Sequence, residues 1–172
     1  MIRLFAQIDN LSRWIAILSA VLTVSIVAMI LSEIVARSLF NISLSFAWEY
    51  SAYAMGVAMF CGAGFTLRTG GHIRVSILAS SLPKRLAYWL DVICTLLGIG
   101  ISGFLSYALI QFAWRSFLSG STSPTMSATP LIIPQGAIAF GASLLTLQLV
   151  VRLVRLFIDE EPEDMSKNYQ VD

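Results

Sequence analysis

The sequence predicts an all-α integral membrane protein that crosses the membrane with four helices. Long apolar segments alternate with short polar ones, and 57% of the 172 residues are hydrophobic whereas only 12% are charged. A soluble domain usually carries about 25% charged residues. The chain therefore has too few polar side chains to cover a water-soluble globule, as its mean hydropathy of +0.79 also indicates. We expect residues 1–172 to form a single membrane domain.

Four segments are long enough to cross a bilayer, which takes about 20 helical residues at about 1.5 Å each. The expected spans are residues 14–36, 47–67, 86–112 and 134–154. Between the second and third spans, apolar residues from 73 to 82 recur at helical spacing, which predicts a short helix lying in the membrane interface. Residues 116–130 are uncharged and rich in Ser, Thr, Gly and Pro, which indicates a loop outside the hydrocarbon.

The distribution of Lys and Arg predicts that both termini lie in the cytoplasm, because cytoplasmic loops carry an excess of these residues. In that orientation only Arg37 and Arg115 fall on the outer side. The other nine fall on the cytoplasmic side: Arg3, Arg13, Arg68, Arg74, Lys84, Arg85, Arg152, Arg155 and Lys167. Residues 158–172 are then an acidic cytoplasmic tail.

Three charged residues lie near the expected outer ends of the first two spans. Glu33 precedes Arg37 by four residues, a spacing that favours an ion pair on one helix and lowers the cost of a charge near lipid. This pair either anchors the helix in the interface or contacts a partner subunit. Glu49 opens the second span, where it meets the positive end of the helix dipole or pairs with Arg37.

A stripe of small residues follows on the second span. Ala54, Ala58 and Gly62 are four residues apart and therefore share one helix face. In lipid, where no hydrophobic force drives helices together, such stripes let two backbones approach closely. The stripe predicts a helix-packing surface.

Asp91 lies about two turns into the third span, where a carboxylate needs a polar partner or a route to water. We interpret it as reaching back to the interface or bonding to the polar stretch before the span. A role in proton transport is the less favoured alternative.

The sequence gives no indication of an enzyme, a cofactor or a metal. Cys61 and Cys94 are too far apart for a Cys-x-x-Cys redox motif and are expected to be buried free thiols. His72 is the single histidine, which excludes haem held by two histidines. A phosphate-binding G-x-x-x-x-G-K motif is absent from the sequence, and a net charge of +1 gives no hint of nucleic acid as a partner.

Several short motifs, taken in order, resemble one family. They are EIVAR at 33–37 leading to Phe40-Asn41, SFAWE at 45–49, GAGFTLR at 62–68, GHIRV at 71–75 followed by Leu82-Pro83, and PLIIP at 130–134. The chain resembles the small membrane subunit, or Q subunit, of the tripartite ATP-independent periplasmic (TRAP) transporters over nearly its whole length. Ser76 departs from the pattern, because an acidic residue is expected after Val75.

The resemblance implies a small permease subunit in the bacterial inner membrane. Such a subunit would act as a scaffold for a large permease subunit in sodium-driven import of an organic acid, of the sialic acid or C4-dicarboxylate type. A periplasmic substrate-binding protein would be the third component. The resemblance does not assign the substrate to this subunit.

On this basis we expect two groups of interface residues. The partner-subunit interface is expected at Glu33, Arg37 and Glu49 on the outer side, together with Ala54, Ala58 and Gly62. A second interface, or a site for anionic phospholipid headgroups, is expected on the inner side at Arg68, His72 and Arg74.

Two alternatives remain open from the sequence. The chain could be an autonomous small proton-coupled transporter that works as a homodimer, a class that needs an acidic residue in mid-span. Glu33 is too near a helix end for that role, which leaves Asp91. The chain could also be an assembly factor with no role in transport.

Overall fold

The computed structural model describes residues 2–69 and 83–158 and consists of four long helices. They are α1 (Ile2–Phe40), α2 (Ser45–Arg68), α4 (Lys84–Ser119) and α5 (Ile132–Ile158). Each is long and apolar enough to cross a membrane, and the described residues form no strand beyond a single bridge between Thr122 and Pro130. The prediction of an all-α protein with four candidate spans is therefore confirmed. The predicted interfacial helix and residues 159–172 of the predicted tail lie outside the described residues, and the orientation stays a prediction.

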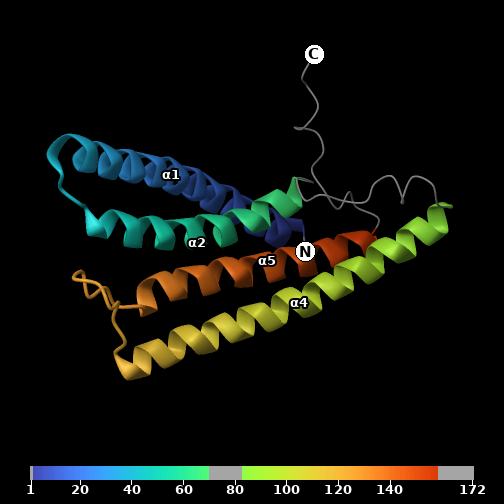
Figure 1. Ribbon diagram of the computed structural model, residues 1–172. Helices are drawn as coiled ribbons and strands as arrows, with labels where there is room; N and C mark the ends of the chain where they lie inside the picture. Colours follow the sequence, from blue (N-terminus) through green and yellow to red (C-terminus); the bar gives the residue numbers. More distant parts are fainter. Residues whose placement is uncertain (1, 70–82, 159–172) are drawn as a thin grey trace, which may run out of the picture.

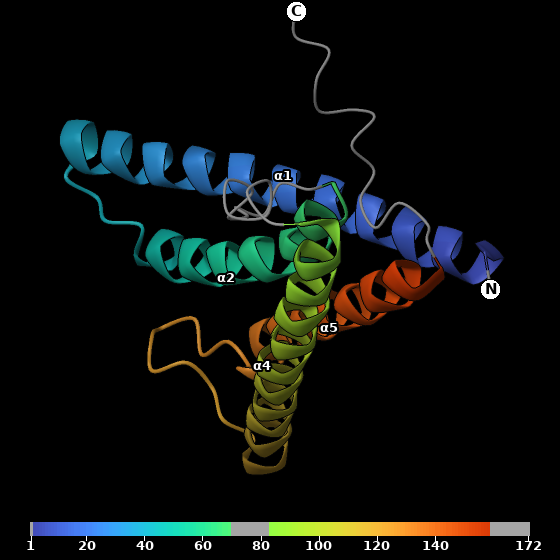
Figure 2. The ribbon, with the colours of Figure 1, turned by 90° about the vertical axis from the view of Figure 1, so that its right-hand side faces the viewer.

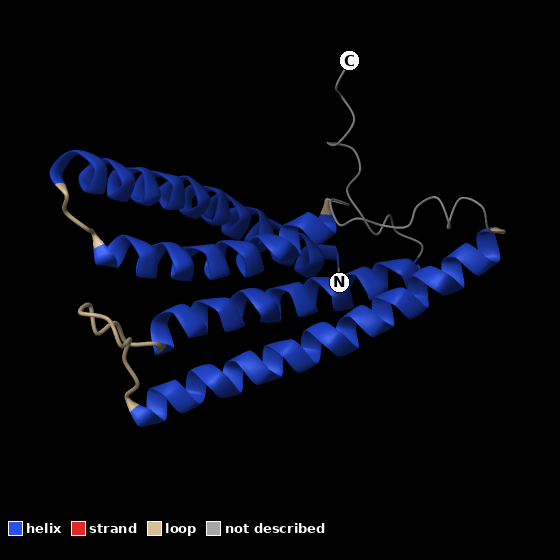
Figure 3. Ribbon diagram, viewed as in Figure 1, coloured by secondary structure: helices blue, strands red, loops and turns tan. Residues whose placement is uncertain are grey.

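The four helices form an open row rather than a closed bundle (Figure 1). The order across the row is α1, α2, α5 and α4, and in the described parts of the chain α4 contacts neither α1 nor α2. The row therefore consists of two helical hairpins, α1–α2 and α4–α5, joined through α2 and α5. Both hairpin connections, residues 41–44 and 120–131, lie at one end of the row, which we call the loop end (Figure 3). The opposite end, where α1 begins and α5 ends, is the termini end.

The two edge helices are longer than a bilayer requires. α1 has 39 residues and α4 has 36, which correspond to about 58 and 54 Å at the helical rise. The hydrocarbon core of a bilayer is only about 30 Å thick. Figure 2 shows α4 crossing the direction of α1 and α2 steeply. Helices of this length must tilt in the bilayer or project beyond it.

The end of α4 lies beyond the predicted third span. The sequence analysis ends that span at residue 112, but α4 continues to Ser119 and so includes Trp114 and Arg115. The helix ends at Gly120, whose left-handed backbone (φ 60°) favours glycine. The Gly120 N–H donates to the Phe117 carbonyl and the Ser121 N–H to the Ser116 carbonyl, which is the Schellman arrangement. The helix therefore continues past Arg115 and ends at Gly120.

The centre of the row is the seam between α2 and α5. A Cβ atom on Gly141 of α5 would lie 2.7 Å from the backbone nitrogen of Cys61 and 2.8 Å from the Phe60 carbonyl carbon. The two backbones therefore touch at this point. Beside it, Cys61 and Leu144 form a buried cluster with Ile15 of α1, so three of the four helices meet here.

Gly141→Ala is expected to destabilise the protein, because the added methyl group collides with backbone atoms of α2 that cannot rotate away. The expected cost is about 1–3 kcal/mol, as for other overpacked sites. Thermal unfolding of the purified protein in detergent, followed by size-exclusion chromatography, measures it.

Gly100→Ala is the matched control for this prediction. A Cβ atom on Gly100 of α4 would meet no atom within 4 Å, so alanine there should only improve helix propensity and leave the midpoint unchanged or higher. Equal midpoints for the two variants would contradict the close approach of α2 and α5.

Candidate functional site

A buried carboxylate joins the two helices of the first hairpin at the loop end. Glu33 of α1 is only 3% exposed. Its Oε1 accepts hydrogen bonds from Arg37 at 2.5 and 3.1 Å and from the Ser43 hydroxyl at 3.2 Å. Its Oε2 accepts the backbone N–H of Leu44, just before α2, at 2.5 Å. The expected Glu33–Arg37 ion pair is present, and the same carboxylate fixes the start of α2.

A second buried carboxylate fastens the other connection to α2. Glu49 accepts hydrogen bonds from the Tyr53 hydroxyl at 2.9 Å and from the Thr125 hydroxyl. A second contact joins α2 to the same loop, since the hydroxyls of Tyr50 and Thr129 are 3.2 Å apart. Glu49 thus uses hydroxyl groups of α2 and of residues 120–131 as partners, whereas Arg37 pairs with Glu33 in the described part of the chain. The carboxylate holds an uncharged loop in place.

At the termini end, one aspartate connects three helices. Asp9 of α1 accepts hydrogen bonds at its Oδ2 from Arg68 of α2 at 3.2 Å and from Arg155 of α5 at 2.6 Å. The Arg155 side chain is 5% exposed. Buried charges of this kind are stable only when they are paired, so Asp9 ties α1, α2 and α5 together.

A second ion pair at the same end joins α4 to α5. Both carboxylate oxygens of Asp91 accept from Nη2 of Arg152, at 2.8 and 3.0 Å. Nη1 of Arg152 donates to the Thr95 hydroxyl at 2.5 Å, so one guanidinium bonds two residues of α4. Asp91 therefore has a cationic partner on a neighbouring helix, which the sequence analysis did not anticipate.

The sequence alone did not indicate that Asp9 and the polar residues of α5 link helices together. Gln148, Arg152 and Arg155 follow one another at intervals of four and three, and so lie on one face of α5. Gln148 is 2% exposed and donates to the Ser12 hydroxyl of α1 at 2.7 Å. The sequence analysis counted the two arginines only as cytoplasmic charges. The helical spacing of three polar residues in an apolar segment is the signal that identifies them as a buried stripe.

The structure places most of the expected outer-interface residues inside the chain's own contacts. Glu33 and Glu49 are buried and have the internal partners described above. A Cβ atom on Gly62 would meet Ser19 of α1, so this glycine lies in the α1–α2 contact. Ala54 and Ala58 are half-buried, and the Arg37 side chain is 57% exposed. Of the expected inner-side residues, Arg68 pairs with Asp9, whereas His72 and Arg74 lie outside the described residues.

The described residues hold no candidate metal site. They include no group of three or more His, Cys, Asp or Glu side chains that could bind a metal ion. Cys61 and Cys94 are both free; Cys61 is buried as expected, but Cys94 is exposed on α4 rather than buried. The ionic groups at the two ends act as links between helices.

These features define a class: a multi-pass membrane protein whose polar residues hold its own helices together. The family described as "Tripartite ATP-independent periplasmic transporters, DctQ component" matches residues 26–159. The chain belongs to this family, and it is the small permease subunit of a TRAP transporter. The family is a transporter component and not an enzyme family. No curated protein and no solved structure gives a significant match to the chain.

Asp91→Asn is expected to destabilise the protein by about 2–3 kcal/mol, because the buried guanidinium of Arg152 loses its anionic partner. A double-mutant cycle with Arg152→Gln should show that the double variant loses less than the sum of the single losses. Chemical unfolding in detergent measures all three. Arg13→Gln, at an exposed position of α1, is the control and should shift stability by less than about 0.5 kcal/mol. If the double variant lost the full sum of the unfolding free energies lost by Asp91→Asn and Arg152→Gln, the result would contradict the ion pair.

Glu49→Gln is expected to loosen residues 120–131 without unfolding the helices. The Ser123 and Leu131 amides, which bond to the carbonyls of Thr129 and Ser121, should exchange hydrogen about tenfold faster once the charged acceptor is lost. Hydrogen-exchange mass spectrometry measures this. Glu33→Gln should instead speed hydrogen exchange at the Leu44 amide. Faster exchange in both connections, residues 41–44 and 120–131, in either variant would contradict the assignment of one carboxylate to each connection.

Proposed function

We propose that this subunit is a rigid scaffold for the large permease subunit in sodium-driven import of an organic acid. The observation that carries the proposal is where the charged side chains are used. Glu33, Asp9 and Asp91 are each bound to cationic partners of the same chain, and Glu49 to hydroxyl groups. Each of these four carboxylates is thus engaged by groups of its own chain.

The shape of the helix row supports a scaffold role. α1 and α4 lie at opposite edges, and the described residues of each expose a nearly continuous series of large apolar side chains. In a bilayer these surfaces can be covered by lipid or by another membrane protein at little cost. An open row with two such edges enlarges the membrane area of a complex more than a closed bundle of the same length would.

The loop end suits contact with a soluble partner. Residues 120–131 carry no charge and are held to α2 through Glu49, while Met126 at the tip is fully exposed. An ordered loop with an exposed methionine can adapt to a partner surface. We infer that this loop contacts the substrate-binding protein, which requires the loop end to be periplasmic, as the Lys and Arg distribution predicts.

The alternative of an autonomous proton-coupled transporter receives no support from Asp91. A carboxylate that carries protons must exchange them with water or substrate, whereas Asp91 bonds the buried Arg152 through both oxygens. We therefore assign Asp91 a structural role.

Affinity purification of the tagged chain from native membranes in mild detergent, followed by mass spectrometry, tests the proposal. The large permease subunit should be recovered with it, whereas recovery of the chain alone as a stable homodimer would overturn the scaffold role. Reconstituted with its partners, the complex should take up an organic acid only with an inward sodium gradient. Competition by sialic acid against C4-dicarboxylates then identifies the substrate class, and uptake without sodium would refute the coupling.

A further inference from the structure

We propose that the groove between α4 and α5 at the loop end binds an anionic phospholipid of the surrounding leaflet. One acyl chain would lie between the two helices, and the phosphate group would bind Arg115. The inference concerns this chain alone and does not rest on the scaffold role.

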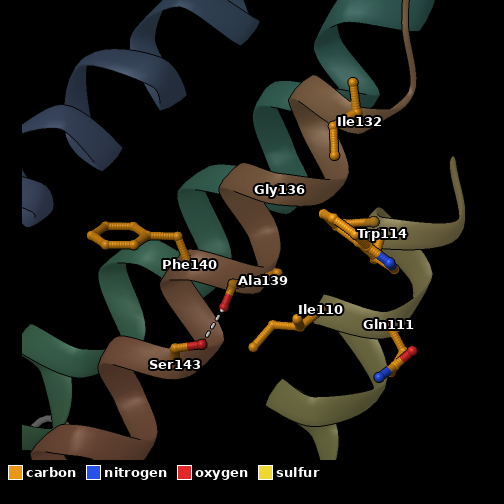
Figure 4. A pocket seen from close by; sticks show the side chains of 9 residues that line it. Ile110, Gln111, Trp114, Ile132, Gly136, Ala139, Phe140 and Ser143 are labelled. Carbon is orange, nitrogen blue, oxygen red and sulfur yellow. Dashed lines mark hydrogen bonds between the residues drawn. The ribbon is translucent and has the colours of Figure 1, made fainter. Parts of the chain in front are cut away.

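The groove is an apolar hollow of about 580 Å³ with small residues at its base. Ala113 of α4 and Ala139 of α5 are buried there, and Gly136 of α5 also lines the groove. Figure 4 shows Ile110 and Trp114 extending from α4 toward α5 at this level. The small residues form the base of the groove, and Ile110 and Trp114 form its side. The channel between them suits a hydrocarbon chain better than a bulky side chain.

The two helices part as they approach the loop end. Nearer the middle of α4, the hydroxyls of Ser106 and Thr146 are hydrogen-bonded at 2.9 Å, so α4 and α5 are in close contact. At Gly136, ten residues closer to the start of α5, an added Cβ atom would meet nothing within 4 Å. The groove is therefore a product of the diverging helices. The groove begins near the loop end and runs toward the middle of the row. The acyl chain of a lipid in one leaflet has the same direction, from the membrane surface toward the bilayer centre.

A polar stripe on α4 lies beside the groove. Tyr107, Gln111 and Arg115 are four residues apart and line a second hollow of about 320 Å³, and Gln111 lines both hollows. Arg115 is exposed, and no ion pair is found for its guanidinium among the described residues. A guanidinium on the surface of a membrane helix requires an anion or water, and its planar fork matches a phosphate group.

The position of the Arg115 charge indicates what kind of molecule the groove binds. Arg115 is four residues from the end of α4, so its charge lies near the loop end, in the hollow that adjoins the groove at Gln111. The lining of the groove continues inward from there to Ser143. The occupant must therefore carry an anionic group at one end and a long apolar chain behind it. A phospholipid has this form. A transmembrane helix of a partner would have to supply a carboxylate at the same level and a side chain narrow enough for the groove.

Quenching of Trp114 by brominated lipids tests the proposal on the full chain in nanodiscs. The Trp114 contribution is the difference between the wild type and Trp114→Phe, with Trp14, Trp48 and Trp89 unchanged. Phosphatidylglycerol with dibrominated acyl chains should quench Trp114 at about one-fifth of the mole fraction that dibrominated phosphatidylcholine needs, as expected for one arginine at the membrane surface. Arg115→Gln should remove this preference, and Gly136→Leu should lower quenching by both lipids because leucine fills the groove.

Two controls keep the outcome specific to the site. Gly100→Leu adds the same side chain at an open position of α4 away from the groove, and Arg13→Gln removes an exposed charge at the termini end; neither should change Trp114 quenching. Equal quenching by the two lipids in the wild type, or unchanged quenching in Gly136→Leu, would overturn the proposal. So would a photo-crosslinker at Ile110 that captures a polypeptide rather than lipid in the purified complex. Loss of lipid binding should leave recovery of the large permease subunit unaffected. The lipid-site proposal and the scaffold proposal can therefore be refuted independently.

Discussion

The contact between α2 and α5 is the constraint on which the rest of the structure depends. The two hairpins meet almost entirely across this seam, because α4 does not contact the first hairpin in the described parts of the chain and α1 touches α5 only near one end. In lipid the seam cannot rely on a hydrophobic force, so its strength comes from close packing and from polar links. Gly141 permits the close packing by allowing α5 to rest on the backbone of α2 at Cys61.

Polar links reinforce the seam at both ends of the row, and they are of different kinds. At the termini end, Arg152 and Arg155 of α5 each bind an aspartate on another helix, so α5 is tied to α4 and to α1. At the loop end, Glu33 and Glu49 bind backbone N–H or hydroxyl groups of the connections. Isolated charges would be costly at these depths, but each is paired or hydrogen-bonded. This set of links is consistent with the scaffold role that we propose for the subunit.

This arrangement divides the surface of the subunit by the partners it can accept. The edge helices offer wide apolar faces to lipid or to a larger membrane subunit, whereas residues 120–131 offer an uncharged loop to the aqueous phase. Between α4 and α5 lies an apolar groove that adjoins a hollow lined by Arg115, and this combination fits the lipid that we propose. In the scaffold role that we propose, a small TRAP subunit of this form would contribute area and attachment surfaces to its complex, and the other components would bind the transported acid.

The sequence by itself determined the class of protein, the four candidate spans and the Glu33–Arg37 ion pair, because composition, apolar run length and i, i+4 spacing are local properties. The loop predicted at residues 116–130 is shorter in the structure, because α4 continues to Ser119 and ends at the left-handed Gly120. Only the tertiary structure decided the order of the helices in the row and the partners of Asp9 and Asp91, which lie 146 and 61 residues away along the chain. Small-residue stripes were equally ambiguous: the sequence shows that Gly62 and Gly141 permit close approach, but not which helix approaches. That choice depends on the simultaneous packing of all four helices, and no local pattern encodes it.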